Sequence, residues 1–179
     1  MKDSPLSDLL RQATINTENQ LMSFSYSIWN DCLDTSRSTG EYIIFYQWGP
    51  IYHGTHVPGP VVQSSSESEY NASCNVGMAL VHFRMLIHEL LKKDTDIVSE
   101  ATHIIIFYSK YYVCMSNNGK DTKHTRHITI WVNFVINGEN CKLHKIELCE
   151  GGLQLSYIEN KNLGENDLNF RIKYIMAKL

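Results

Sequence analysis

Hydrophobic and polar residues alternate along the first third of the chain, and this pattern predicts three antiparallel strands. Residues 22–29 alternate with a period of two, which is typical of a strand that packs one face against a core. Residues 41–48, with the sequence EYIIFYQW, are rich in the β-branched and aromatic side chains that strands favour. Residues 51–57 and 60–64 predict one or two further strands, interrupted at Pro58-Gly59-Pro60.

The spacing of apolar residues then becomes helical. Residues 67–93 carry apolar side chains on one helical face and predict a long helix. Ser65 or Ser66 is expected to cap its N-terminus, because a serine hydroxyl can accept a hydrogen bond from a free backbone N–H group there. Glu67 and Glu69 lie in the first turn, where the helix dipole favours negative charge.

The second half of the chain alternates short strands with helices. Residues 102–107, THIIIF, form a continuous apolar run that indicates a central buried strand. The other predicted elements are helices at 109–117 and at 127–137, ending at Asn137-Gly138, a strand at 143–149, and helical segments at 153–161 and 165–178. This order predicts an α/β fold with a mixed sheet, in which three antiparallel strands are followed by parallel strands and helices flank the sheet.

Length and composition limit the class of protein. At roughly 150 residues per domain, 179 residues predict one domain, with residues 1–20 as a short N-terminal helix and linker and residues 21–179 as the domain. The formal net charge is 16 − 19 = −3, which excludes a strongly basic nucleic-acid scaffold but not a local basic patch. Hydrophobic residues make up 43% of the chain, which excludes global disorder.

The expected compartment follows from features that the sequence lacks. No apolar run reaches the ~18 residues of a membrane span, so we expect no membrane partner. The N-terminus has no apolar core of the signal-peptide kind. Five cysteines are an odd number at irregular spacing, which favours reduced thiols. A cytoplasmic or nuclear protein that is not secreted is therefore expected.

Four segments of the chain form a recognisable series. They are Trp29 with Asp34-Thr35-Ser36-Arg37-Ser38-Thr39-Gly40, then Ser64-Ser65-Ser66-Glu67-Ser68-Glu69-Tyr70, then Lys123-His124-Thr125-Arg126-His127-Ile128, and last Gly152-Leu153-Gln154-Leu155 with Ile158 and Lys161. In order and spacing they resemble the ribonuclease H domain of copia-type retrotransposon polyproteins, where the corresponding segments are the one between the first two strands, the start of the first helix, a basic loop and a terminal motif. Together the matches cover residues 22–164, and they imply a ribonuclease-H-like fold without the polymerase that accompanies it in the reverse transcriptase.

The resemblance also implies a catalytic site, which this chain keeps only in part. The family cleaves RNA in RNA–DNA hybrids with two Mg²⁺ ions about 3.5–4 Å apart, held by three aspartates and one glutamate. The glutamate position falls on Glu69, which is retained. The aspartate positions fall on Tyr26, Tyr108 and Tyr157, and a further acidic position beside the first falls on Ile28.

Tyrosines at these positions predict that metal-dependent hydrolysis is lost. A phenol with a pKa near 10 is neutral at pH 7, and magnesium requires hard, anionic oxygen ligands. Glu67 is two helical positions from Glu69 and Asp31 lies past the strand end, so neither replaces the lost carboxylates. We therefore expect no cofactor, the ancestral Mg²⁺ being lost. Both selected or designed replacement and drift account for the tyrosines.

The resulting prediction is a catalytically inactive binding or interaction module, with weak binding of an RNA–DNA hybrid or other nucleic acid, or a protein partner. The alternative is a metal-dependent endoribonuclease of hybrids that uses Glu69 and further ligands. Candidate nucleic-acid contacts are Arg37, Lys120, Lys123, His124, Arg126 and His127.

These candidates have plainer readings as well. The basic loop is equally typical of a solvated surface loop, and Arg37 of a structural salt bridge. The pairs His124-x-x-His127 and Cys141-x-x-His144 have a zinc-like spacing. The family loop and the start of a strand explain these pairs better, so we predict no metal site.

Overall fold

The computed structural model describes residues 21–46, 49–59, 61–91, 103–107, 129–141, 143–148, 151–158 and 161–176. Three predictions lie outside these residues: the N-terminal helix and linker at 1–20, the helix at 109–117, and the basic loop that holds Lys120, Lys123, His124, Arg126 and His127.

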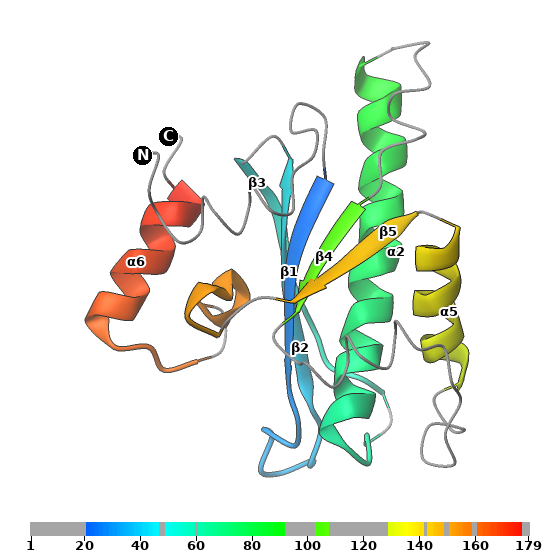
Figure 1. The fold of residues 1–179 in the computed structure, drawn as a ribbon. Helices are drawn as coiled ribbons and strands as arrows, with labels where there is room; N and C mark the ends of the chain where they lie inside the picture. Colours follow the sequence, from blue (N-terminus) through cyan, green and yellow to red (C-terminus); the bar gives the residue numbers. More distant parts are fainter. Residues whose placement is uncertain are drawn as a thin grey trace.

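A five-stranded mixed sheet forms the centre of the domain (Figure 1). The strands are β1 (Leu21–Ile28), β2 (Thr39–Tyr46), β3 (Gly49–His56), β4 (His103–Phe107) and β5 (His144–Leu148). Their order in space is β3-β2-β1-β4-β5. Strands β1, β2 and β3 are antiparallel, whereas β4 runs parallel to both β1 and β5. This topology confirms the predicted fold class.

After β2, where residues 51–57 and 60–64 predicted one or two strands, the structure has one strand, β3. β3 ends at His56, and the described residues 61–64 are not strand. Instead, the indole N–H of Trp29 donates a hydrogen bond to the carbonyl oxygen of Val62 (3.1 Å). This segment is thus fastened to the end of β1 by a side chain instead of by a β ladder.

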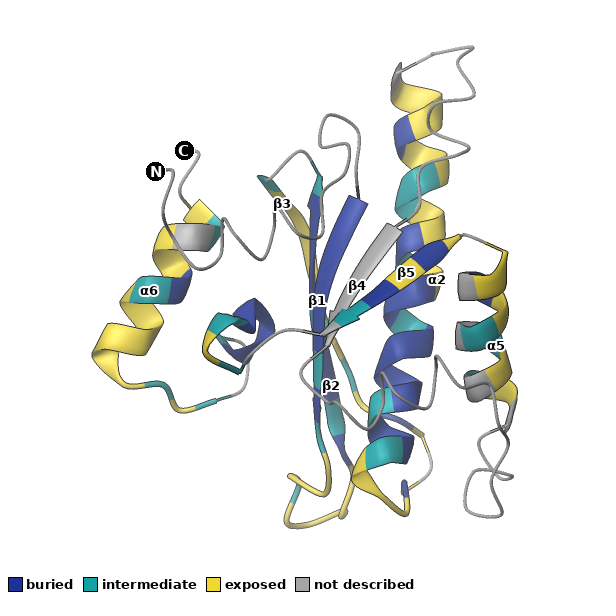
Figure 2. Ribbon diagram, in the orientation of Figure 1, coloured by how far each residue is buried: buried dark blue, intermediate teal, exposed yellow. Residues whose placement is uncertain are grey.

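Helices cover both faces of the sheet (Figure 1). On one face lie α2 (Ser65–Leu91) and α5 (Thr129–Asn140). On the other face lie two short 3₁₀ turns, η2 (Gly151–Leu153) and η3 (Leu155–Ile158), and α6 (Glu165–Met176). The two turns replace the single helical segment predicted at 153–161. Because the sheet is covered on both sides, β1 is buried on both faces, while α6 is exposed along most of its length (Figure 2).

Helix α2 begins one residue earlier than the predicted caps allow. Ser64 is the cap, because its hydroxyl oxygen accepts a hydrogen bond from the backbone N–H of Glu67 (3.2 Å). The Glu67 carboxylate in turn accepts the backbone N–H of Gln63 (2.5 Å). This reciprocal arrangement satisfies two free backbone donors at once. It explains why Ser64, rather than Ser65 or Ser66, caps the N-terminus of α2.

Helix α5 continues past Asn137-Gly138, where the sequence predicted its end. Gly138 is buried inside the helix, and a Cβ built there would lie 2.0 Å from Cε1 of His144. The glycine is therefore required for the close packing of α5 against the start of β5, and not for a left-handed helix end.

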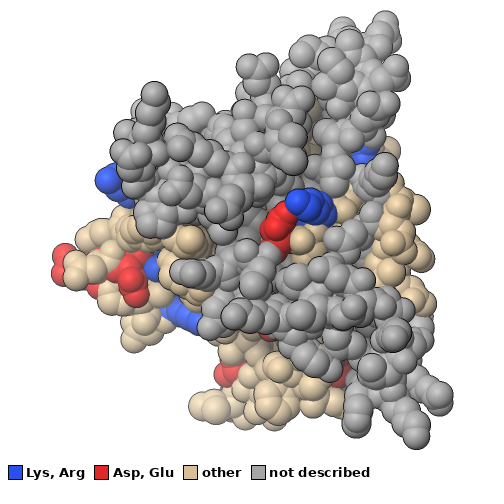
Figure 3. Space-filling model, viewed as in Figure 1, with Lys and Arg blue, Asp and Glu red and all other residues tan. Residues whose placement is uncertain are grey.

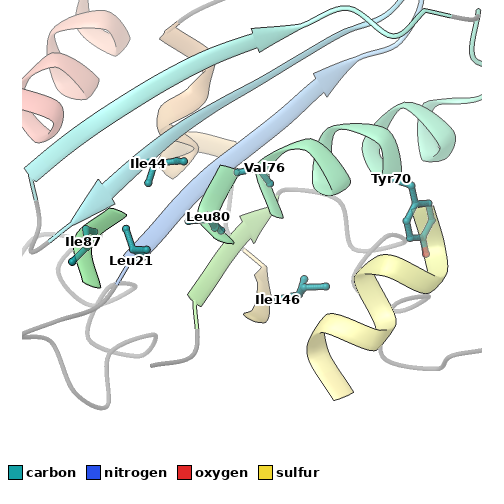
Figure 4. Close-up of a cluster of buried hydrophobic side chains, with 7 residues drawn as sticks. All are labelled: Leu21, Ile44, Tyr70, Val76, Leu80, Ile87 and Ile146. Atoms are coloured by element: carbon teal, nitrogen blue, oxygen red, sulfur yellow. The ribbon is translucent and has the colours of Figure 1, made fainter. Parts of the chain in front are cut away.

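The main hydrophobic core lies between α2 and the sheet. It contains the buried side chains of Leu21, Ile44, Tyr70, Val76, Leu80, Ile87 and Ile146 (Figure 4). A Cβ on Gly40 would lie 3.0 Å from Cβ of Ala72, so small residues let the helix approach the sheet closely. On the opposite face, Phe24 and Phe45 pack edge to face with ring centroids 5.8 Å apart. Among the helices in the described part of the chain, none is both long and apolar enough to cross a membrane.

Candidate functional site

The candidate site lies where β1 separates from its parallel neighbour β4. The two strands pair only from Met22 to Phe24 of β1. One residue further on, the carbonyl oxygen of Ser25 accepts a hydrogen bond from the Gln154 side-chain amide (2.8 Å) instead. Gln154 is fully buried and directly precedes η3, so this bond holds η3 against the end of β1.

Tyr26 and Tyr157, two positions that the family resemblance assigns to metal-binding aspartates, meet at this point. Their ring centroids are 4.5 Å apart and the rings are inclined at 71°. Tyr157, in η3, is only 5% exposed, whereas Tyr26, in β1, is half-buried. An edge-to-face aromatic pair of this kind adds about 0.5–1.5 kcal/mol beyond the area it buries.

Lys161 places a positive charge over both rings. Its ammonium nitrogen is 3.4 Å from the ring centroid of Tyr157 and 4.6 Å from that of Tyr26. The backbone N–H of Lys161 also donates to the carbonyl oxygen of Tyr157 (3.1 Å), which fixes where the side chain starts. Burial, followed by the nearby positive charge of Arg171, lowers the pKa of Lys161 from its usual value.

Arg171 of α6 fastens this helix to the two 3₁₀ turns. The residue is only 3% exposed. Its guanidinium donates to the carbonyl oxygens of Gln154 (3.1 Å), Gly151 (3.2 Å) and Gly152 (3.4 Å). Its carbon Cζ lies 5.6 Å from the ring centroid of Tyr157. The sequence analysis missed this residue, because an arginine in an amphipathic helix is usually on the solvated face.

Glu41 is a second residue that the sequence analysis missed. It stands directly opposite Tyr26 in the β1–β2 ladder, and opposed residues of an antiparallel pair share one face of the sheet. Glu41 is only 2% exposed. The sequence analysis placed this residue in a predicted strand and gave it no role. In the structure, the strand that carries it, β2, contacts η3.

The retained carboxylate, Glu69, lies in α2 at the same end of β1. The hydroxyl groups of Ser68 and Ser27, the sequence neighbours of Glu69 and Tyr26, are hydrogen-bonded to each other. Glu69 itself is half-buried, and its carbonyl oxygen accepts the Ser73 hydroxyl (2.6 Å). The third tyrosine of the predicted set, Tyr108, lies outside the described residues.

Arg37 is exposed in the turn between β1 and β2. Its backbone carbonyl oxygen accepts the N–H of Cys32 (3.2 Å), and among the described residues its side chain forms no ion pair. In the same turn, the Thr35 side chain and the backbone of Thr35 and Asp34 donate hydrogen bonds to Cys32 and lower the pKa of its thiol. The structure therefore keeps Arg37 available at the surface, and gives no support to the structural salt bridge.

The described residues do not fit the pair of magnesium ions that the fold family uses. Two of the expected ligands are phenols, and an ammonium group lies over both of them. Across the residues that can be described, no three histidine, cysteine, aspartate or glutamate side chains gather into a possible metal site. Magnesium requires anionic oxygen ligands in octahedral geometry, and at the two tyrosine positions the site offers neutral phenols with an ammonium group over them instead.

Charged side chains of the described residues are dispersed over the face of the molecule seen in Figure 3, with blue and red groups interspersed. One ion pair on β5 joins Lys145 and Glu147. In this view the described residues form no broad basic surface. At the candidate site, positive charge comes from Lys161 and Arg171.

Comparisons with known proteins identify the fold. Neither the scan against family models nor the search of the curated proteins gives a match. Among solved structures, the chain is similar to ribonuclease H1 from the archaeon Halobacterium salinarum, with a TM-score of 0.53 and 10% identity over 76% of this chain and 90% of that one. It is also similar to the N-terminal ribonuclease H domain of a Mycobacterium tuberculosis protein, with a TM-score of 0.55 and 7% identity over 87% of this chain and 97% of that one. Identities this low concern the fold alone, and on this evidence the chain has the ribonuclease-H-like fold.

Proposed function

We propose that this chain is a catalytically inactive ribonuclease-H-like domain, derived from a copia-type retrotransposon, that binds nucleic acid without cleaving it. The substrate class that its fold favours is an RNA–DNA hybrid. The observation that carries the proposal is the contact between Tyr26 and Tyr157, whose ring centroids are 4.5 Å apart beneath the Lys161 ammonium group.

The contact supports the residue-by-residue match to the family. Tyr26 and Tyr157 are far apart in the sequence and were paired only because the family's aspartates would converge at these positions. Their convergence in space is what the match requires. The Ser64–Tyr70 segment lies at the start of α2, as the resemblance implies, and residues 152–158 of the terminal motif lie in η2 and η3, with Gln154 hydrogen-bonded to β1.

Electrostatics favours the loss of hydrolysis. Phenols are neutral at pH 7, so they do not offset the cost of taking two dications from water. Lys161 and Arg171 add two positive charges beside the rings. Repulsion between like charges at contact range is worth several kcal/mol at the effective dielectric of a protein surface. We therefore propose that no divalent cofactor binds here.

A location in the cytoplasm or nucleus is part of the same proposal. Cys32, Cys74 and Cys141 are free thiols, and persistently free thiols are typical of reducing compartments. An RNA–DNA hybrid would be encountered in either place.

The test uses the full chain and an RNA–DNA hybrid labelled on the RNA strand. Binding is measured by gel shift in EDTA, and cleavage is measured by denaturing gel with Mg²⁺ or Mn²⁺. We expect a shifted complex in EDTA and intact RNA with either metal, and we expect neither metal to raise the melting temperature beyond its general salt effect.

A Glu69→Gln variant separates the proposal from its alternative. If the chain is inactive, this variant behaves as the wild type in the cleavage assay. Metal-dependent cleavage by the wild type that disappears in Glu69→Gln would establish the endoribonuclease instead. Absence of any hybrid binding would refute the nucleic-acid role and leave a protein partner as the remaining class.

A further inference from the structure

The Lys161 ammonium group is a cation that the chain itself holds at the place where the family holds metal. Its nitrogen lies within 4.6 Å of both ring centroids, and its backbone is tied to Tyr157. Aromatic faces stabilise a cation without neutralising it, unlike a carboxylate. An ammonium group has three donors, so the sides that do not face the rings can still donate to an anion.

Two cations lie beside the rings. Among the described residues Lys161 forms no ion pair, and the charged group that acts on its pKa is the Arg171 guanidinium. Arg171 donates its hydrogen bonds to backbone carbonyl oxygens, which are neutral. Since neither cation has a direct ion pair within the described part of the chain, this pair of positive groups favours an anionic ligand.

The rings themselves are poorly placed to stack on nucleobases. Tyr157 is 5% exposed, and the ammonium group covers the faces of both rings. Stacking requires an open aromatic face. The group that this cluster offers to a ligand is therefore the ammonium, and the nucleic-acid group that matches it is a backbone phosphate.

We propose that Lys161 binds a backbone phosphate of the nucleic acid at the end of β1, so that the site holds its ligand without a divalent metal. This inference rests on the proposed nucleic-acid role and names the contact that serves it. Tyr26 and Tyr157 are positioning residues, because they hold the ammonium group in place, and Arg171 positions Tyr157.

The experiment measures the dissociation constant of a labelled hybrid in EDTA at several salt concentrations, for the wild type and three variants. Lys161→Gln removes the charge, and Lys161→Arg keeps it. Lys173→Gln is the matched control, because Lys173 is exposed on α6 and loses the same charge. For Lys161→Gln we expect roughly three- to tenfold weaker binding, and a slope of log K against log salt shallower by about 0.9.

The other two variants define the specificity of the effect. Lys161→Arg should restore most of the affinity and the full slope, and Lys173→Gln should stay within about twofold of the wild type. Equal effects of Lys161→Gln and Lys173→Gln would refute the phosphate contact while leaving hybrid binding intact. A wild type that binds only with Mg²⁺ would also refute it, and a wild type that never binds would refute the proposed function as well.

A second measurement is made on the wild-type protein and uses one variant only to assign a signal. Reductive methylation with ¹³C-formaldehyde labels lysine side chains for NMR, and the Lys161→Arg spectrum assigns the Lys161 signal by its absence. We expect the Lys161 signal to lie at an unusual position because of the two rings, and to move on titration with hybrid. A Lys161 signal that stays fixed while the hybrid binds would overturn the inference.

Discussion

Arg171→Met tests whether one buried guanidinium holds the two 3₁₀ turns and α6 together. Arg171 is 3% exposed and donates to carbonyl oxygens of three residues outside its own helix. Methionine keeps much of the aliphatic length of the side chain and removes every donor. The substitution therefore isolates the hydrogen bonds from the packing of the stem.

The expected loss follows from the two shorter bonds, to Gln154 and Gly151, at 3.1 and 3.2 Å. Hydrogen bonds that involve a charged group contribute about 1.5–3 kcal/mol each, so two give roughly 3–6 kcal/mol. Removing a buried cation returns part of its desolvation cost, which brings the expected decrease in the free energy of unfolding to about 3 kcal/mol. For a domain of this size that corresponds to a fall in Tm of roughly 6–12 °C.

Urea unfolding followed by far-UV circular dichroism measures this decrease, with an unchanged m-value as the sign that the same surface unfolds. The matched control is Lys173→Met, two positions along α6 and exposed, which should change stability by less than about 0.5 kcal/mol. A loss of under about 1 kcal/mol for Arg171→Met would refute the reasoning, because the desolvation returned would then equal the bonds lost.

Three further predictions concern a glycine, a histidine and two thiols. Gly138→Ala should lower the free energy of unfolding by about 1–3 kcal/mol in thermal or urea unfolding, because its Cβ would collide with His144 at the start of β5. Alanine usually stabilises a helix, so the sign of the effect is diagnostic. Gly152→Ala, with open space at the Cβ position, should be nearly neutral. Burial lowers the pKa of His56 below its usual 6.5, so the unfolded chain takes up the proton more readily. The free energy of unfolding should therefore fall as pH drops below about 6.5. Plots of stability against pH between 7 and 5 should be flatter for His56→Gln than for the wild type, and parallel plots would contradict this. Hydrogen bonds lower the pKa of the Cys32 thiol, and burial raises the pKa of the Cys74 thiol. Peptide mapping after brief iodoacetamide treatment should therefore find Cys32 modified before Cys74, and the reverse order would disprove this difference in reactivity.

Local periodicity was enough to predict the sheet and its long helix. Strands β1, β2, β4 and β5 lie within two residues of the predicted ranges, since their short length and their β-branched and aromatic residues decide for strand where an apolar run alone would not. The mixed topology followed from hairpin strands before a crossover helix. Each of these inferences uses residues close in the sequence, and the structure confirms them.

The errors occur where one contact decides between alternatives that local composition leaves equal. Ser64, Ser65 and Ser66 are equal as caps by composition, and the choice among them depends on Glu67, whose spacing from Ser64 is that of a capping box. The sequence analysis did not use this spacing. The asparagine–glycine pair in α5 reads as a helix end, but its glycine makes room for His144 at the start of β5, and this contact depends on how the strand packs against the helix.

The candidate site shows the same division. The pairing of Tyr26 with Tyr157 came from the family resemblance and not from any local pattern. Arg171 and Glu41 escaped notice because each has the local environment of a surface residue. Arg171 is buried where α6 meets the two 3₁₀ turns, and Glu41 is buried in a strand that contacts η3. No short segment of sequence encodes either contact.

The chemistry of the site has a common logic if the family's aspartates once stood at Tyr26 and Tyr157. A cluster of carboxylates repels itself and needs dications from solution to be stable, so ligand binding there depends on metal concentration. Neutral rings need no counter-ion, and they stabilise a tethered ammonium group by cation–π contact. The positive charge that a polyanion requires is then part of the chain. Lys161 is one of the residues that match the family's terminal motif, so drift at the aspartate positions alone would leave this lysine where it is. What favours anion binding is the resulting chemistry, in which an ammonium group lies over two neutral rings instead of beside carboxylates.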